Sequence, residues 1–161
     1  MWPSGAVGVR GAQVAEDSGL GPRSGSGVAA TSPADLLAEA MALIAVTVNH
    51  PHLLYGSDVW GFIDNEAAAS AAIRAGAEAD VVTAIVQTAH LLWAELRCRV
   101  WVEWIDSNSN PSDGLSRKGL VDPWTVRQGW ELREAWQPPW RGHSHTPNQL
   151  AGTMFQHWGL E

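Results

Sequence analysis

Two short apolar runs, separated by a pair of helical patterns, restrict the fold of this chain more than any other feature. The first run is VWGFID, which ends at Asp64, and the second is RVWVEWI, which begins at Arg99. Between them, EAAASAAIRAG and VVTAIVQTAHLLWAELR repeat apolar residues at helical spacing, with Gly76 expected to end the first helix and Asp80 to cap the second. Strands joined through helices in one sheet run parallel, because a parallel pair needs a long crossover. The sequence therefore predicts an α/β domain built on a parallel strand–helix–strand unit.

An upstream helix start and changes in composition divide the chain into three segments. Ser32 and Pro33 form an N-cap and a first-turn proline, so they predict a helix over residues 34–49. The segment before them is rich in Gly, Ser and Ala and buries too little apolar surface to offset its ordering entropy. We predict a flexible or degenerate leader, a domain, and a Trp- and Pro-rich tail over residues 1–33, 34–118 and 119–161, respectively.

Tryptophan is unusually frequent, with ten tryptophans against one tyrosine and two phenylalanines. VWGFID is a continuous apolar run, which is typical of a strand in a sheet covered on both faces. The tryptophans of the patterned segments, Trp60, Trp93, Trp101 and Trp104, are therefore predicted to lie in the core. The C-terminal tryptophans have two interpretations: they stack on bases, or they pack the tail onto the domain, which we favour.

Three carboxylic acids accompany these elements. Asp64 ends the first strand, Asp113 follows the second strand, and Glu39 lies one turn into the upstream helix. Ligands gather at the carboxyl ends of parallel strands, so Asp64 and Asp113 can meet at one edge of the sheet. Three acids on separate elements are what a site needs in order to gather divalent metal ions. Each also has a structural interpretation: Asp64 as a strand-end or capping residue, Asp113 as an N-cap, and Glu39 as a surface residue of an amphipathic helix.

Two polar side chains beside these acids are candidates for contact with nucleic acid. Asn65 could orient a substrate or cap the helix that follows it, and capping is the interpretation that we favour. Arg117 could touch a phosphate or only offset the charge of Asp113. Asn110 and Ser112 are expected to fix the turn before Asp113 through local hydrogen bonds.

The bulk properties exclude several classes of protein. The formal net charge of −7 argues against a basic patch that grips nucleic acid by charge alone. The single cysteine, Cys98, excludes an internal disulfide and a thiolate zinc cluster, and a buried filler is favoured over a reactive thiol. No run of about 18 apolar residues is present, so no membrane span is expected. The N-terminus lacks the pattern of a secretory signal, which predicts an intracellular protein.

Three segments of the chain resemble one known family. FIDNEAAASAAI, RVWVEWIDSNSNPSDGLSR and LLAEAMALIAV look like the ribonuclease H domain of retrotransposon reverse transcriptase polyproteins. The DN dipeptide after an apolar strand and the N-P-x-D-x-x-S-R ending carry the resemblance, which covers about residues 34–118. It implies a three-layer α/β fold with a mixed five-stranded sheet. It also implies cleavage of the RNA strand of an RNA–DNA hybrid and a polymerase domain in a parent polyprotein.

The resemblance further implies a site in which four acids hold a pair of Mg²⁺ or Mn²⁺ ions. Glu39 matches the helix glutamate, Asp64 the aspartate that ends the fourth strand, and Asp113 the aspartate of the final motif. The first-strand aspartate has no clear match, because Asp17 precedes Glu39 too closely for three strands of about 5–6 residues and their turns. The amino-terminal strands are expected to be missing or degenerate. Their loss predicts low activity, an open edge on VWGFID and an exposed hydrophobic face.

Three functional hypotheses follow from these observations. The first is a retroelement-derived enzyme that hydrolyses the RNA of RNA–DNA hybrids with Mg²⁺ or Mn²⁺. The second is a catalytically dead module that binds the hybrid by its shape. The third is a protein-interaction module in which the acids are surface features and the tryptophans form an interface.

Overall fold

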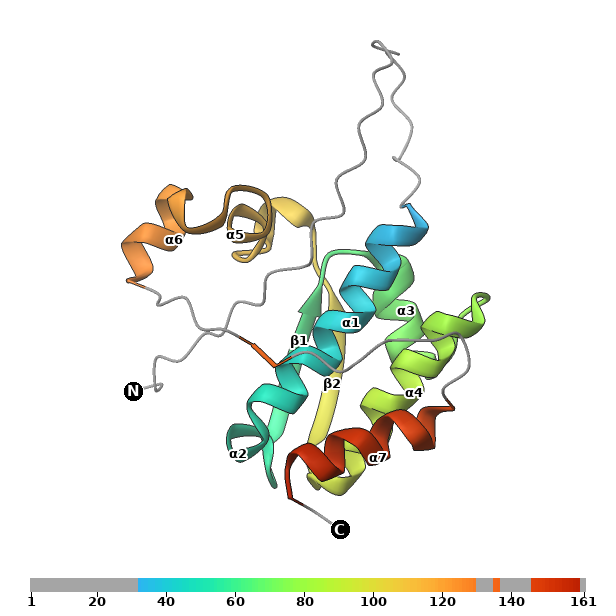
Figure 1. Cartoon of the computed structure of the whole chain (residues 1–161). Coiled ribbons are helices and arrows are strands. Elements are labelled where there is room, and N and C mark those ends of the chain that lie inside the picture. Colours follow the sequence, from blue (N-terminus) through green and yellow to red (C-terminus); the bar gives the residue numbers. More distant parts are fainter. Residues whose placement is uncertain (1–31, 130–134, 137–145, 160–161) are drawn as a thin grey trace.

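The computed structural model describes residues 32–129, 135–136 and 146–159, which form a mixed α/β fold in which helix dominates (Figure 1). The predicted α/β class is confirmed. The elements, with η marking a 3₁₀ turn, are α1 (Pro33–Asn49), α2 (Pro51–Leu54), β1 (Asp58–Ile63), α3 (Glu66–Arg74), α4 (Asp80–Glu95), β2 (Arg99–Trp104), η1 (Ser107–Ser109), α5 (Asp113–Lys118), η2 (Gly119–Val121), α6 (Pro123–Gln128) and α7 (Pro147–His157).

The sheet consists of two parallel strands in the part of the chain that the structure describes. β1 pairs with β2 in a register that runs from Asp58 opposite Arg99 to Ile63 opposite Trp104. α3 and α4 make the crossover between the strands, which brings the chain back to the same end of the sheet. The predicted parallel strand–helix–strand unit is confirmed.

α1 begins where the sequence predicts, because its start is determined by local chemistry. Ser32 Oγ accepts a hydrogen bond from the backbone N–H of Asp35 at 3.2 Å, and Asp35 Oδ2 accepts one from the N–H of Ser32 at 3.3 Å. This capping box pairs two backbone donors that the first turn would leave without partners. Pro33 occupies the first helical position, where the missing N–H costs nothing.

The ends of α3 and α4 differ from the sequence prediction by one residue each. The residue in the left-handed conformation after α3 is Ala75, with φ 52°, and not Gly76. α4 has Ala79 at its N-cap, and Asp80 is its first helical residue with no capping hydrogen bond from its side chain. The assignment of Gly76 and Asp80 as the stop and the cap is wrong. Asp80 still favours the helix start, because a negative charge complements the positive end of the helix dipole.

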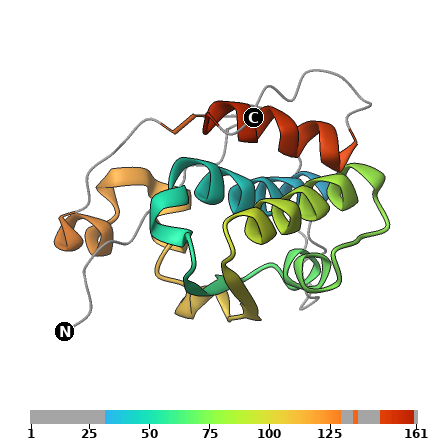
Figure 2. The same cartoon turned by 90° about the horizontal axis from the view of Figure 1, so that it is seen from below.

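The helices form two layers on one side of the sheet. α1 and α4 lie side by side over one face of the strands, and α7 lies on the outer side of both (Figure 2). α3 packs against α1 and both strands. In the described residues, therefore, every long helix lies on the same side of the two strands.

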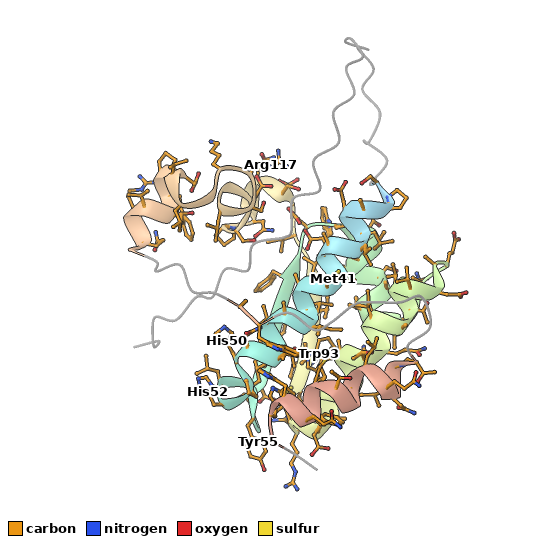
Figure 3. All side chains as sticks on the ribbon, in the orientation of Figure 1. Met41, His50, His52, Tyr55, Trp93 and Arg117 are labelled. Carbon is orange, nitrogen blue, oxygen red and sulfur yellow. The ribbon has the colours of Figure 1, made fainter. Side chains whose placement is uncertain are left out.

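Residues 107–129, here called the arm, lie away from the helical layers. The arm contains η1, α5, η2 and α6, and α5, η2 and α6 pack against one another. It follows the carboxyl end of β2 (Figure 1). Figure 3 places Arg117 on this arm, well apart from Met41 on α1 and Trp93 on α4.

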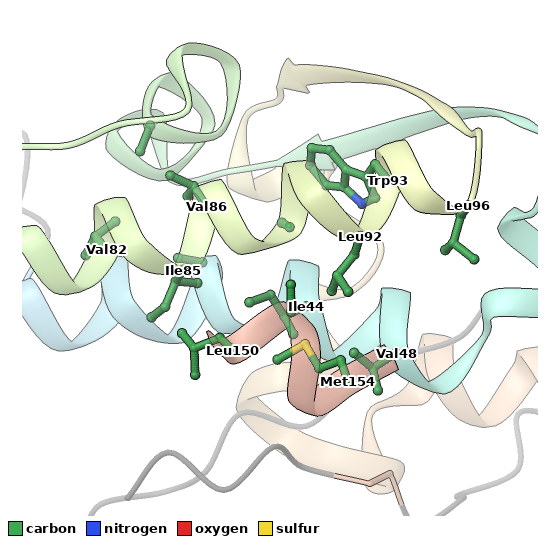
Figure 4. Packing of buried hydrophobic residues seen from close by; sticks show 14 of the residues in the cluster. Ile44, Val48, Val82, Ile85, Val86, Leu92, Trp93, Leu96, Leu150 and Met154 are labelled. Carbon is green, nitrogen blue, oxygen red and sulfur yellow. The ribbon is translucent and has the colours of Figure 1, made fainter. Parts of the chain in front are cut away.

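The core lies between the three long helices and includes residues from the predicted tail. Its largest fully buried apolar side chains are Ile44 and Val48 from α1, Ile85, Val86 and Leu92 from α4, and Met154 from α7 (Figure 4). Trp93 is buried beside them, and its Nε1 donates to Thr47 Oγ1 at 3.0 Å. α7 therefore belongs to the same core as α1 and α4.

Two tail tryptophans pack onto α1. Trp158 Nε1 donates to the carbonyl oxygen of Val48 at 3.0 Å. The Asn49 side chain binds the backbone of Trp136 twice, accepting from its N–H at 2.7 Å and donating to its carbonyl oxygen at 2.9 Å. The interpretation that the tail packs onto the domain is confirmed for these two residues, whereas Trp130 and Trp140 lie outside the described residues.

The outer face of the sheet is apolar and exposed. Trp60 is 62% exposed, Phe62 56% and Trp101 45%. The rings of Trp60 and Trp101 stack across the two strands, with centroids 5.8 Å apart. Trp104, at the end of β2, is also 50% exposed. The prediction that four strand and helix tryptophans lie in the core is wrong for all but Trp93. Trp60 and Trp101 lie on the face of the sheet that the described helices leave open, and Trp104 is the last residue of β2.

Candidate metal centre

Glu39 and Asp64 reach the same end of the domain from two different elements. α1 runs antiparallel to the strands, so its first turns lie near their carboxyl ends (Figure 1). Glu39 lies in these early turns, and Asp64 follows β1 directly. The carbonyl oxygen of Asp64 accepts a hydrogen bond from Trp104 Nε1 at 3.1 Å, which ties the end of β1 to the end of β2. The helix start and the strand end thus determine the positions of both acids.

The charge of Glu39 is unfavourable where it lies. Partial burial raises the pKa of the Glu39 carboxyl, and the negative charges of Asp64 and Asp35 raise this pKa further. Asp35 is committed to the capping box of α1. Asp64 is therefore the acid that can share a ligand with Glu39. A divalent cation between the two carboxylates would relieve their repulsion, so this pair of oxygen donors fits such an ion.

Asp113 makes a different interaction. It is the first residue of α5, with Ser112 at the N-cap. Its Oδ1 forms an ion pair at 2.8 Å with Nε of Arg117, which lies one helical turn further along α5. Asn110 Oδ1 accepts from the backbone N–H and the hydroxyl of Ser112, at 3.0 and 2.7 Å. The predicted role of Asn110 and Ser112 in the turn is confirmed. Asp113 is not among the charges that raise the pKa of Glu39.

Of the three predicted metal ligands, Glu39 and Asp64 thus form a pair, and Asp113 is separate from them. Among the residues that the structure describes, no three or more His, Cys, Asp or Glu side chains are grouped to hold one metal ion. Glu39 and Asp64 are the part of the predicted site that the fold brings together. Asp17, the alternative fourth acid, lies outside the described residues.

The two candidate nucleic-acid contacts are both engaged within the protein. Asn65 is buried, and its Oδ1 caps α3 by accepting from the backbone N–H of Ala68 at 3.1 Å. The capping interpretation of Asn65 is confirmed. Arg117 neutralises Asp113, but its side chain is 69% exposed, so its guanidinium is also accessible to an external phosphate.

No family model, curated protein or solved structure matches this chain. Its proposed activity consequently depends on its own residues and their geometry. None of the helices in the described residues has the length and apolar character needed to cross a bilayer.

Sequence reasoning missed one buried acid, Asp122. Its Oδ2 accepts from the backbone N–H groups of Thr125 and Trp124 and from the Thr125 hydroxyl, at 2.9, 3.1 and 3.2 Å. The hydrogen bond from the Thr125 backbone is the main cause that lowers the pKa of Asp122. A Cβ at Gly114 would lie 2.6 Å from the Asp122 carboxyl, so this glycine permits α5 and α6 to meet. The order Asp-Pro at the start of a helix was the available signal, and it indicates a cap rather than catalysis.

Cys98 is buried, as the filler interpretation expects. Burial raises the pKa of its thiol, so the reactive thiolate is disfavoured at neutral pH.

Proposed function

We propose that this chain is a retroelement-derived ribonuclease H-like domain that hydrolyses the RNA strand of RNA–DNA hybrids with Mg²⁺ or Mn²⁺. Glu39 and Asp64 hold the cation, and Asp113 joins them when nucleic acid is bound. The family is proposed from the resemblance of the sequence motifs around these acids. The parallel β1–β2 unit with its helical crossover agrees with the fold of that family.

The observation that carries the proposal is the like-charge pair of Glu39 and Asp64. Glu39 and Asp64 lie towards the carboxyl end of the parallel strands, where burial of Glu39 raises its pKa most and the negative charge of Asp64 raises this pKa further. Like-charge pairs of this kind are concentrated at functional sites, where a ligand offsets the repulsion. The pair is consistent with an oxygen-rich cation site.

Each residue has a distinct role in the proposed site. Glu39, in α1, and Asp64, directly after β1, bind and orient the cation, because the core fixes both elements in place. When bound, the cation lowers the pKa of a coordinated water and neutralises charge on the scissile phosphate. Arg117 exchanges Asp113 for a phosphate of the nucleic acid, since guanidinium groups pair with phosphate as well as with carboxylate. That exchange frees the Asp113 carboxylate.

A cleavage assay tests the catalytic part of the proposal. The full chain is incubated with a labelled RNA–DNA hybrid and Mg²⁺ or Mn²⁺, beside Asp64→Asn and Glu39→Gln. Asp80→Asn is the matched control, because Asp80 is an exposed acid at a different helix start. We expect slow cleavage by the wild type and the control, and at least about a hundredfold less by the other two variants. Equal cleavage by wild type and Asp64→Asn contradicts the proposal.

Cation binding gives a readout that does not depend on turnover. Mn²⁺ broadens NMR signals of nearby nuclei, so the backbone signals of Asp64 and Glu39 should broaden before those of Asp80. Mg²⁺ should lower the pKa of the Glu39 carboxyl towards its ordinary value, because the cation favours the charged form. Broadening that is equal across all exposed acids contradicts a specific site.

The second candidate is a module that binds the hybrid without cutting it. The separation of Asp113 from the acid pair favours this candidate, because two carboxylates alone hold a hydrated cation weakly. Hybrid binding that weakens on Arg117→Ala, with no cleavage in either metal, would select it over the enzyme. Lys118→Ala is the control for general loss of positive charge.

A further inference from the structure

The outer face of the sheet carries a strip of aromatic side chains with charged residues at both ends. Trp60, Phe62 and Trp101 lie on it, each close to half exposed or more. At one end of the strip, Arg99 pairs with Asp58 of the neighbouring strand through Nε at 2.6 Å. At the other end, the exposed acid Glu103 lies opposite Phe62. Exposed apolar patches rimmed by polar residues mark interaction surfaces. This strip is therefore a candidate interface.

The outer edge of β1 offers backbone groups beside that strip. The carbonyl oxygens of Ser57 and Ile63 accept from backbone N–H groups of the β2 side, so these odd-numbered residues direct their backbone groups towards β2. Because the backbone alternates, Asp58, Trp60 and Phe62 direct their N–H and C=O groups to the opposite edge. In the described residues, β1 pairs with no strand other than β2.

β1 also lacks the features that keep an edge strand from pairing. Natural edges are protected by Lys, Pro, a bulge or a covering element. The sequence DVWGFI contains no Lys and no Pro, and its register with β2 has no bulge. Its single charge, Asp58, is already neutralised by Arg99. Such an edge can accept another strand without burying an unpaired charge.

We propose that β1 pairs with β1 of a second copy of this chain, in antiparallel orientation, to give one four-stranded sheet across a two-fold axis. The outward-directed residues determine the register, in which Trp60 faces Trp60 of the second copy and Asp58 faces its Phe62. The two-fold axis keeps the two Asp58 side chains apart. It also extends the Trp60–Trp101 stack into a row of four indole rings.

The size of this interface is sufficient for a weak dimer. Six residues of strand span about 20 Å. With the exposed parts of the two central aromatic side chains, we expect the two copies to bury about 1,000 Å² in total, the lower limit for a specific interface. The net charge of −7 on each copy opposes association, so added salt should strengthen the dimer. Binding to nucleic acid has the opposite salt dependence.

Sedimentation equilibrium of the full chain without nucleic acid tests the proposal over the micromolar range. We expect a mass rising towards twice 17.3 kDa, and a dissociation constant about thirtyfold weaker for Trp60→Lys. Val121→Lys is the matched control, because Val121 is 78% exposed and lies on the arm, so this variant should dimerise as the wild type does. A wild type that stays monomeric overturns the proposal. Unchanged dimerisation by Trp60→Lys also overturns it.

Cysteine cross-linking tests the register. In a Cys98→Ala background, a chain with Asp58→Cys is mixed with one carrying Phe62→Cys. These positions face each other in the proposed dimer about 5.5 Å apart between Cα atoms, within disulfide range. Each position lies about 13 Å from its own copy, too far for a disulfide. We expect the mixed dimer to form on mild oxidation and the two homodimers not to form. Preferential homodimers would overturn this register.

Discussion

The two faces of the β1–β2 sheet are built from alternate residues of the same two strands, yet their surroundings are opposite. On the inner face, Val59, Ile63 and Val102 pack against the helices. On the outer face, Trp60 and Phe62 are more than half exposed. The outer face also carries the charged residues Asp58, Arg99 and Glu103, but its aromatic side chains are as apolar as the inner set. The comparison teaches that burial requires an opposing element, and that a continuous apolar run does not guarantee one.

The difference between the faces also separates stability from function. The covered side has its apolar side chains removed from water, and the acid pair Glu39 and Asp64 lies at its rim. The open side contributes aromatic surface that is about half exposed, and within one copy its Trp60 and Trp101 rings add a cross-strand stack. We therefore expect substitutions on the covered side to change folding, and substitutions on the open side to change association.

Neighbouring residues on opposite faces give the largest expected contrast. Ile63→Ala should lower the free energy of unfolding by about 2–4 kcal/mol, because Ile63 is 4% exposed and its removal leaves a cavity against α3. Phe62→Ala should change it by less than about 1 kcal/mol, since Phe62 is mainly exposed. Urea unfolding at one protein concentration measures both. Equal losses would mean that the outer face is covered as well.

Local signals explain what could be predicted from the sequence. Ser32 and Pro33 determine the start of α1, and Asn65 caps α3, because each acts within three residues of itself along the chain. The parallel pairing followed from the crossover length. The same pattern places Asp64 at the carboxyl end of the sheet and predicts Asp113 beside it, whereas Glu39 is matched to the site only by the family resemblance.

Non-local contacts explain what could not be predicted. Whether Trp60 is covered depends on elements elsewhere in the chain, although Arg99 and Glu103, which alternate with apolar residues on the neighbouring strand, indicate a solvent-facing side. Whether Asp113 reaches Asp64 is likewise a non-local question, whereas its local pairing with Arg117 is one of the two interpretations that the sequence allows. Met154 reaches the core from a segment without a clear period before it, because α7 packs on α4.

Removal of the Asn65 side chain that caps α3 should have the next largest effect on stability. Asn65→Ala should cost about 1 kcal/mol of stability, within a range of about 0.5–2, because the N–H of Ala68 loses its acceptor. Asn65→Ser is the control, since serine is a comparable N-cap. Thermal or urea unfolding of the two variants measures the difference. If alanine and serine behave alike, the cap does not hold α3 on the sheet.

The charge of Glu39 gives a smaller effect with a defined pH dependence. Its pKa is raised in the folded state, so ionisation costs stability above that pKa, and the protein becomes more stable as the pH falls through it. Glu39→Gln should therefore be more stable than the wild type at pH 7, by up to about 1 kcal/mol. The advantage should vanish below the ordinary pKa of glutamate.

The matched control for Glu39→Gln should change the stability in the opposite direction. Glu66→Gln removes an exposed acid from the first turn of α3, where a negative charge is favourable, so it should slightly destabilise the protein at pH 7. Urea midpoints at neutral and acidic pH measure both variants. Stabilisation by both would point to net charge as the cause, and not to the pair of Glu39 and Asp64.

The ion pair on the open face has the smallest expected effect. Arg99 binds Asp58 through two nitrogens, Nε at 2.6 Å and Nη2 at 2.8 Å, but both side chains are more than half exposed. Water competes for such a pair, so a double-mutant cycle with Asp58→Asn and Arg99→Gln should give a coupling below about 0.5 kcal/mol that decreases with salt. A coupling above about 1 kcal/mol, insensitive to salt, would mean that this corner of the open face is shielded from water. The outer face would then resemble the inner face, and the distinction between a side that folds and a side that associates would not hold.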